Sequence, residues 1–205
     1  MKLLVATRSP GKTREIRELF AGLPFQLVFP DGLELDRLPE ERELENAETY
    51  AGNAIAKARY FAQRGALPAV ADDSGIEVDA LAGAPGVHSA RFATAQGDSA
   101  GDEANNALLL ERLRGVPEEQ RTARYRCVVA YLETPTTAAE LVEATCEGRI
   151  LMAPRGAGGF GYDPLFFSDD LQRGFAEVAP ATKHRVSHRG RAFRALIEVL
   201  LRRAM

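Results

Sequence analysis

Apolar residues in the first quarter of the chain recur at spacings that predict strands alternating with helices. Residues 3–6 are a short, fully apolar run typical of a buried strand, and residues 25–29, apolar apart from Gln26, predict a second strand. Between them an amphipathic segment follows Ser9 and Pro10, two residues favoured at the N-cap and first position of a helix. Residues 31–48 are acidic and predicted to be irregular.

The rest of the chain continues this alternation. Residues 49–64 and 104–114 have the spacing of amphipathic helices, and a last such helix ends the chain. Residues 124–132 and 140–148 predict two antiparallel strands around a loop rich in threonine and proline. No internal repeat divides the 205 residues, so we expect one α/β domain over residues 1–205.

The most informative stretch is residues 69–79, where an apolar, β-branched run is followed by Asp72, Asp73, Ser74 and Gly75. This pattern predicts a strand that ends in a chemical site. A buried carboxylate without a partner is strongly destabilising, so these acids need a cation, basic side chains or water. Taken alone, the stretch is more simply a polar turn, because Asp, Ser and Gly are common turn residues.

Composition and charge limit the function classes. With 45% hydrophobic and 27% charged residues and a formal net charge of −3, the chain is typical of a globular protein and not of a nucleic-acid-polymer binder. Cys127 and Cys146 lie in apolar segments without metal-ligand spacing, which favours buried thiols in a reducing compartment. No apolar run reaches membrane-spanning length, so we expect a cytoplasmic protein without a membrane partner.

Two polar segments could bind phosphate. Residues 7–12 join a strand to a helix N-terminus, where free N–H groups and the helix dipole favour anions, and Lys12 adds a charge. Asn53 and Lys57 are four residues apart and share one face of the next helix, and Glu45 precedes that helix. Helix capping and surface exposure explain these residues equally well, and the Walker P-loop pattern is absent.

Two later segments could bind a flat ligand. Residues 155–164 form a glycine-dense loop around Phe160, which suits either a hairpin turn or a stacking platform that the backbone approaches closely. Residues 183–191 form a basic cluster immediately before the last helix. That cluster is either a solvated helix start capped by Ser187 or a contact for phosphate or base oxygens.

The order of these segments closely resembles the inosine/xanthosine triphosphate pyrophosphatase family, over nearly the whole chain from Leu4 to the final helix. The resemblance rests on the following motifs: Ala6-Thr7-x-Ser9-x-Gly11-Lys12, Asn53-Ala54-x-x-Lys57-Ala58, Ala71-Asp72-Asp73-Ser74-Gly75, Gly83-Ala84-Pro85-Gly86-Val87-x-Ser89-Ala90-Arg91, Gly158-Gly159-Phe160-Gly161-Tyr162-Asp163-Pro164 and Ser187-His188-Arg189-Gly190.

The resemblance implies both a fold and a reaction. The fold is an elongated two-lobed α/β structure around a long mixed β-sheet with flanking helices, with the active-site cleft between the lobes, in a homodimer. The reaction is Mg²⁺-dependent hydrolysis of ITP, dITP and XTP to the monophosphate and pyrophosphate, which removes deaminated purines from the nucleotide pool.

The resemblance also implies residue roles. Asp73 is the general base or a metal-bound carboxylate supported by Asp72, and Glu45 shares the Mg²⁺ with Asp73. Lys12 and Lys57 neutralise the triphosphate and act with the two aspartates in catalysis. The residues implied to bind substrate are Thr7, Arg8, Ser9, Pro10, Gly11, Lys12, Asn53, Ser74, Phe160, Gly161, Tyr162, Asp163, Lys183, His188 and Arg189.

The chain departs from the family pattern at three places. Ser9 replaces an asparagine, Leu44 stands where an acid often precedes Glu45, and the acidic pair before Lys183 is missing. The Ser9-Pro10 pair also favours an alternative, a Maf-like pyrophosphatase that acts on pyrimidine or modified nucleotides. A second alternative is a non-catalytic purine nucleotide sensor, against which the joint retention of Lys12, Lys57 and Asp73 argues.

Overall fold

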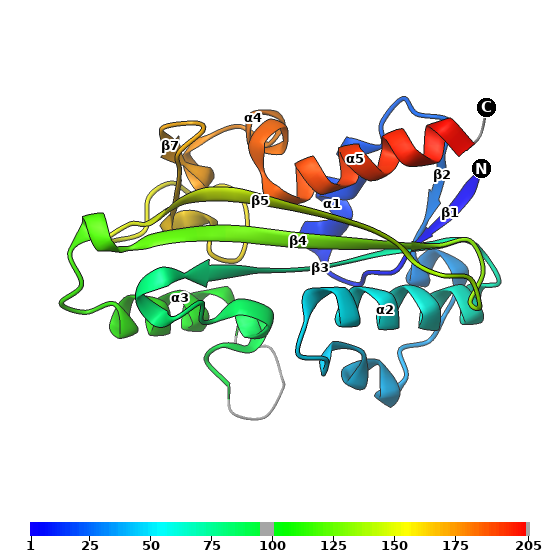
Figure 1. The fold of residues 1–205 in the computed structure, drawn as a ribbon, viewed down its shortest axis with the longest axis horizontal. Helices are drawn as coiled ribbons and strands as arrows, with labels where there is room; N and C mark the ends of the chain where they lie inside the picture. Colours follow the sequence, from blue (N-terminus) through cyan, green and yellow to red (C-terminus); the bar gives the residue numbers. More distant parts are fainter. Residues whose placement is uncertain (95–100, 204–205) are drawn as a thin grey trace. The chain divides into compact units, whose positions relative to one another are not determined.

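The computed structural model describes residues 1–94 and 101–203. Within these residues, seven strands form one mixed sheet in the order β2-β1-β3-β4-β5-β6-β7, with helices on its faces (Figure 1). The α/β class predicted from the sequence is confirmed. The strands are β1 (Lys2–Val5), β2 (Gln26–Val28), β3 (Ala69–Val78), β4 (Thr122–Leu132), β5 (Glu140–Ile150), β6 (Phe166–Ser168) and β7 (Arg173–Gly174), and the α-helices are α1 (Pro10–Leu19), α2 (Tyr50–Gly65), α3 (Asp102–Arg112), α4 (Pro180–Val186) and α5 (His188–Arg203).

Parallel pairing sets the register of the strands that lead into the candidate site. β1 pairs in parallel with β2, Leu3 opposite Leu27, and with β3, Val5 opposite Val70. The later pairs β5–β6 and β6–β7 are antiparallel. Because β1 stops at Val5, the edge of β3 beyond Val70 is left to the loop that follows β1.

Three helices begin where a hydroxyl can cap them. The Ser9 hydroxyl accepts from the Lys12 N–H at 3.4 Å at the start of α1, and Thr49 accepts from Gly52 at 3.1 Å at the start of α2, as predicted. The hydroxyl of Ser187 accepts from the Gly190 N–H at 3.1 Å and caps α5 in the same way.

The prediction that a strand ends at Asp72 and Asp73 is wrong. β3 continues through both acids to Val78, and the two carboxylates lie in its interior. The long strand β4 is the neighbour of β3 in the sheet and continues to flank it where β1 has ended. Polar residues in the middle of a strand resemble a turn when only local sequence is considered.

Other differences concern short elements. The segment predicted to be irregular contains two 3₁₀ helices, Pro30–Leu33 and Pro39–Glu45. The basic cluster at residues 183–191 does not precede the last helix but forms part of α4 and the first turn of α5. β6 and β7 have only 3 and 2 residues, too few to produce a detectable period in the sequence.

The chain divides into two compact units. The first contains Met1–Asp73, Cys127–Glu143 and the chain from Ala192 onward, and the second contains Ser74–Arg126 and Ala144–Arg191. Each unit has its own hydrophobic core. The cleft that the family resemblance implies remains a prediction.

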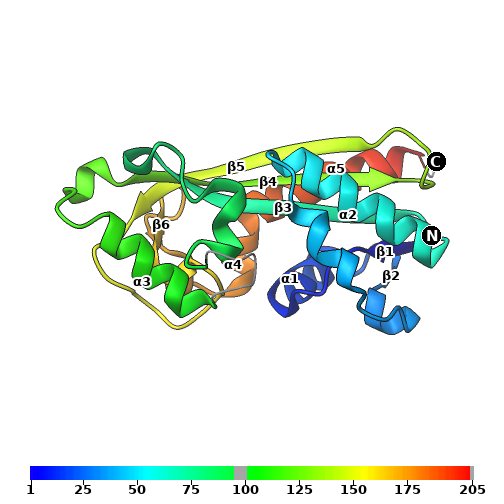
Figure 2. The same cartoon turned by 90° about the horizontal axis from the view of Figure 1, so that it is seen from below.

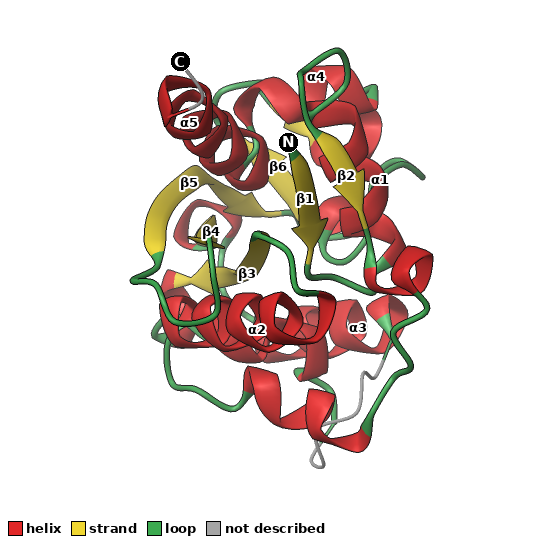
Figure 3. Ribbon diagram, turned by 90° about the vertical axis from the view of Figure 1, so that its right-hand side faces the viewer, coloured by secondary structure: helices red, strands yellow, loops and turns green. Residues whose placement is uncertain are grey.

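In the first unit, helices cover both faces of the strands. Figures 1 and 3 show α2 on one face and α5 on the other, and Figure 2 shows α2 lying across β3. Ala58 and Phe61 of α2 pack with Leu4 of β1, and small alanines on facing positions allow close approach. On the α5 side, the rings of Phe20 and Phe193 meet edge to face at 6.0 Å.

In the second unit, Leu109 of α3 and Leu113, which caps the C-terminus of that helix, belong to a core that includes Ile76 and the aromatic rings of Tyr125 and Phe166. The rings of Tyr125 and Phe166 are 4.8 Å apart. These contacts fix α3 and the strands around the glycine-dense loop.

Both cysteines are buried and free, as their apolar surroundings predict. Burial raises the pKa of the Cys146 thiol to about 11, so it remains protonated at neutral pH. Among residues 1–94 and 101–203, no helix is long and apolar enough to cross a membrane.

Gly190→Ala should destabilise the protein. A Cβ at this position of α5 would lie 1.9 Å from the carbonyl oxygen of His184, which is backbone and cannot move aside cheaply. We expect the free energy of unfolding to fall by about 1–3 kcal/mol, as in other overpacked sites. Urea denaturation measures the change, and Gly32→Ala is the matched control because its Cβ would meet nothing within 4 Å. Equal stability of the two variants would contradict the packing.

Candidate functional site

The loop after β1 and the carboxylates of β3 meet at the edge of β3 that β1 leaves unpaired, where both acids are buried. The carbonyl of Val70 accepts a hydrogen bond from the N–H of Ala6 at 2.7 Å, which extends the pairing with β3 by one residue beyond the end of β1. Two residues further, Lys12 Nζ lies 3.3 Å from the carbonyl oxygen of Asp72 and 2.8 Å from its carboxylate. Lys12 therefore takes the place that a continuing strand would fill.

The loop itself is held by local hydrogen bonds. The N–H of Ser9 donates to Thr7 Oγ1 at 3.2 Å, and the Ser9 hydroxyl accepts from Lys12. A hydroxyl that accepts in this way keeps its own proton to donate to a ligand. Pro10 occupies the start of α1, which has no acidic residue in its first turn, and Gly11 follows it. This helix start is electrostatically suited to an anion.

Lys57 holds the second carboxylate of β3. Its Nζ lies 2.9 Å from Asp73 Oδ1 and 2.8 Å from Glu45 Oε1. Asn53, one turn earlier on α2 and fully buried, donates to Asp73 Oδ2 at 3.0 Å. The shared helix face predicted for Asn53 and Lys57 is thus confirmed, and both side chains point at Asp73.

The charge of Lys57 is fixed by its neighbours. Burial alone would lower the pKa of a lysine, but the surrounding carboxylates, Asp73 foremost, outweigh burial and raise the pKa of Lys57. Lys57 therefore remains positively charged throughout the neutral pH range.

These residues form what we call the carboxylate–lysine cluster, and all belong to the first unit. Its members are Lys12, Glu45, Asn53, Lys57, Asp72 and Asp73.

The cluster offers oxygen ligands to a hard divalent cation. Glu45 and Asp73 both bind Lys57 Nζ, so their carboxylates face a common point. In the described part of the chain, no group of three His, Cys, Asp or Glu side chains is arranged to hold a metal by itself. Two carboxylates fit Mg²⁺, which commonly takes one or two carboxylates together with substrate phosphates and water.

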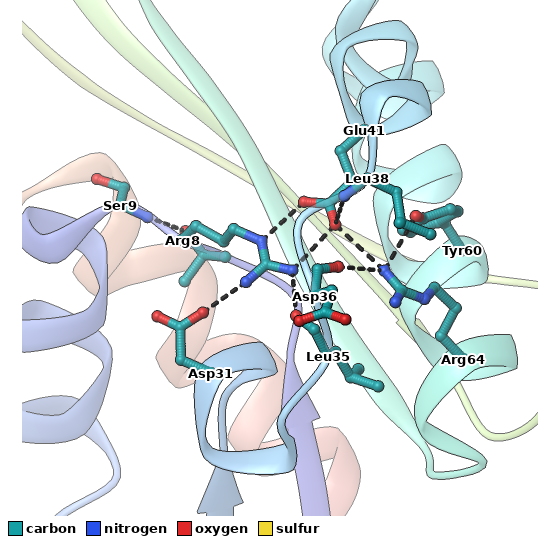
Figure 4. A network of polar contacts seen from close by, with 10 residues as sticks. Arg8, Ser9, Asp31, Leu35, Asp36, Leu38, Glu41, Tyr60 and Arg64 are labelled. Carbon is teal, nitrogen blue, oxygen red and sulfur yellow. Dashed lines mark hydrogen bonds and ion pairs between the residues drawn. The ribbon is translucent and has the colours of Figure 1, made fainter.

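Arg8 has partners within the protein. Its guanidinium donates to both oxygens of Glu41 at 2.7 and 2.9 Å, to Asp31 at 2.5 Å and to the carbonyl of Leu35 at 2.7 Å (Figure 4). These bonds engage all three guanidinium nitrogens and four of the five N–H groups, so at most one N–H, on Nη1, is left for a substrate contact unless a bond breaks.

In the second unit, Phe160 lies between cations. Lys183 Nζ is 5.1 Å and the Arg189 guanidinium 5.6 Å from the centre of its ring, within cation–π range. Lys183 is buried and pairs with Asp163 at 2.5 Å. Asp163 also accepts from the N–H of Phe160 at 2.9 Å, so one carboxylate positions both the ring and the cation.

His188 and Arg189, at the start of α5, have different surroundings. The ring of His188 is buried and stacks on Tyr125 at 4.5 Å with an interplanar angle of 6°. Arg189 Nη2 donates to the hydroxyl of Ser74 at 2.7 Å. We call Ser74, Phe160, Asp163, Lys183, His188 and Arg189 the aromatic–cation cluster, and all six lie in the second unit.

Tyr162 has an internal role in the structure. Its hydroxyl donates to the carbonyl of Ser89 at 2.8 Å, and burial raises the pKa of this phenol. Because the side chain is buried, any contact with substrate here would be made by the backbone of Tyr162 or by neighbouring residues.

Sequence reasoning missed two residues that hold the glycine-dense loop. Asp102 accepts from the Gly161 N–H at 2.6 Å, and Asn106 donates to the Gly161 carbonyl at 3.0 Å. Gly161 has a φ of +64°, a backbone conformation that favours glycine. The only sequence signal was an acid and an amide one turn apart at a helix start, which capping explains equally well.

Lys57→Met should destabilise the protein, because it leaves two carboxylates without their shared cation. We expect a loss of about 3–5 kcal/mol, toward the lower end because Glu45 is partly exposed and can be rehydrated. Since the pKa of Lys57 is raised, the stabilisation is present below the unfolded-state pKa of about 10.4 and is lost as pH rises past it. Urea denaturation across this pH range measures the difference from wild type, with Gln63→Met on the exposed side of α2 as control. A constant difference at high pH would contradict the assignment.

Comparison with known proteins identifies the family of the chain. The model of the Ham1 family matches residues 3–199. A dITP/XTP pyrophosphatase of Desulforamulus reducens is 46% identical over 206 residues, covering 98% of this chain and 96% of the relative. One from Thermus thermophilus is 47% identical over 198 residues, covering 97% and 91%.

Solved structures share the fold. A HAM1 protein from Coxiella burnetii matches with a TM-score of 0.85 at 35% identity, covering 98% of this chain and 99% of that one. A nucleoside-triphosphatase, dITP/XTP pyrophosphatase, from Mycobacterium abscessus matches with a TM-score of 0.70 at 41% identity, covering 96% and 98%. The family expected from the motifs is confirmed: the chain belongs to the Ham1 family.

Proposed function

We propose that the chain hydrolyses dITP, XTP and ITP to the monophosphate and pyrophosphate in a Mg²⁺-dependent reaction. The observation that carries this proposal is the carboxylate–lysine cluster, which holds Lys12 and Lys57 against two adjacent acids beside the N-terminus of α1. Two lysines and a helix start neutralise a polyphosphate, and a neighbouring carboxylate can accept a proton from water.

Each member of the carboxylate–lysine cluster then has a task. Lys12 and Lys57 lower the charge of the triphosphate and of the leaving pyrophosphate, which is most of what this class of reaction requires. The hydroxyl groups of Thr7 and Ser9 donate hydrogen bonds to phosphate oxygens. Asp73, held by Lys57 and Asn53, orients the attacking water and takes its proton.

Glu45 and Asp73 are the residues that would hold Mg²⁺. Both carboxylates lie on Lys57, and the remaining ligands would come from phosphate oxygens and water. A bound Mg²⁺ supplies charge neutralisation of the phosphate chain and lowers the pKa of coordinated water. Asp72, which pairs with Lys12, supports this charge arrangement.

The aromatic–cation cluster suits a purine with an oxygen at position 6. The half-buried ring of Phe160 offers a stacking surface, and Lys183 and Arg189 offer donors beside it. Hypoxanthine and xanthine present an oxygen at position 6, whereas adenine presents an amino group. A donor that faces an amino group loses its hydrogen bond, which costs about 1–3 kcal/mol when buried.

The alternatives make different demands. A Maf-like enzyme would prefer pyrimidine or modified nucleotides, and a sensor would bind purine nucleotide without turnover. A sensor has no need of acids beside a polyanion, which Asp72 and Asp73 provide. We further propose that the enzyme acts on the cytoplasmic nucleotide pool. We also propose that the chain assembles with a second copy of itself, and sedimentation equilibrium would test this assembly.

A substrate panel tests the proposed reaction. Pyrophosphate release with Mg²⁺ should be confined largely to ITP, dITP and XTP when these are compared with GTP, ATP, dTTP and UTP, and EDTA should abolish it. Preference for dTTP or UTP would favour the Maf-like alternative. Nucleotide binding without release of pyrophosphate would favour the sensor.

Asp73→Asn should abolish turnover while nucleotide binding survives. The amide keeps the size of the side chain but cannot accept a proton from water, so we expect kcat to fall by at least about 100-fold. Steady-state kinetics and calorimetric binding of ITP measure the two effects, with Glu48→Gln as an exposed control. Thermal unfolding checks that the variant is folded. Turnover near the wild-type rate would remove the base assignment.

A further inference from the structure

Arg8 and Glu41 form a partly buried ion pair that links two distant segments of the first unit. Arg8 contacts both carboxylate oxygens of Glu41, and the exposed fractions of the two side chains are 17% and 8% (Figure 4). Glu41 also accepts from the Leu38 N–H at 3.3 Å and from Arg64 at 3.3 Å. The Glu41 carboxylate therefore accepts hydrogen bonds from three residues: Arg8, Leu38 and Arg64.

The ion pair is maintained at neutral pH. Burial would raise the pKa of Glu41, but the hydrogen bonds and charge of Arg8 outweigh it, and the net effect lowers the pKa of this carboxyl group. Hydrogen bonding to Glu41 likewise raises the pKa of Arg8. Both groups therefore remain charged at neutral pH.

The two ends of the ion pair carry parts of the carboxylate–lysine cluster. Arg8 lies between Thr7 and Ser9, in the loop that leads to Lys12. Glu41 lies in the 3₁₀ helix Pro39–Glu45, and the last residue of that helix is the carboxylate that binds Lys57 at 2.8 Å. That helix has no fully buried residue, and its Leu44 is only partly buried against the core of the first unit, so polar contacts are needed as well to fix its position.

We propose that Arg8 and Glu41 are positioning residues that fix Glu45 relative to the loop of residues 7–12. This inference rests on the proposed function for the role of Glu45 as a Mg²⁺ ligand. The bidentate Arg8–Glu41 contact specifies both distance and angle, which a single lysine could not do. Arg8 then acts through Glu41 rather than by binding phosphate.

Hydrogen exchange measures the positioning directly. In Glu41→Gln, amides of residues 36–46 should exchange faster than in wild type, while those of β3 and α2 remain protected. Arg8→Lys should do the same more mildly. The control is Asp31→Asn, because Asp31 contacts Arg8 but its side chain is 82% exposed. Unchanged exchange of residues 36–46 in Glu41→Gln would overturn the positioning role, whether or not the enzyme hydrolyses ITP.

Kinetics distinguish positioning from substrate binding. In Glu41→Gln, the Mg²⁺ concentration for half-maximal ITP hydrolysis should rise about 10-fold, as for other groups that orient metal ligands. At saturating Mg²⁺, KM for ITP should change less than about 2-fold. Arg8→Gln should reproduce this pattern, and the double variant should be no worse than the more impaired single variant.

A different pattern would assign Arg8 to the substrate. If Arg8→Gln raised KM for ITP at saturating Mg²⁺, Glu41→Gln did not, and the two effects added, Arg8 would bind phosphate directly and the proposal would fail. If wild type released no pyrophosphate, the proposed function would fail, while the exchange experiment would still decide whether the ion pair positions the segment.

Discussion

The constraint on which the first unit depends is the need to keep two adjacent acids charged inside a strand. Consecutive side chains of a strand point to opposite faces, so Asp72 and Asp73 cannot share one cation and each requires its own. The chain supplies Lys12 from the loop and α1 for the first and Lys57 from α2 for the second. The helices that cover the sheet therefore also carry the two lysines whose charges compensate the buried carboxylates.

The same constraint explains why the acids lie beyond the end of β1. Where β1 pairs with β3, the edge of β3 is satisfied by backbone groups, as at Val70. Two residues later the carbonyl of Asp72 receives Lys12 instead. A parallel sheet commonly binds ligands beyond the carboxyl ends of its strands. Here a shorter neighbour creates such a position in the middle of a longer strand.

Local sequence was sufficient for the helices α1 and α2. Caps at Ser9 and Thr49 and the helical spacing of α2 depend only on near neighbours, and the predicted helices follow them closely. The course of β3 could not be predicted, because it depends on the pairing of a strand more than 40 residues later in the chain, which local patterns do not encode. The short strands β6 and β7 depend on pairing in the same way.

The candidate site shows the same division between local and long-range information. The motifs identified the chemistry-bearing residues, and Asn53 and Lys57 converge on Asp73 as their helical spacing requires. The partners of Arg8 could not be predicted, because Glu41 is 33 residues away in a segment without periodicity. A motif residue beside a phosphate-binding loop is easily assigned to the ligand, yet a guanidinium with all its nitrogens engaged is better placed to shape the loop than to leave it. In such a site, residues with the chemistry to bind a ligand can be proposed from the sequence, whereas the contacts that hold the surrounding segments in place emerge only from the folded chain.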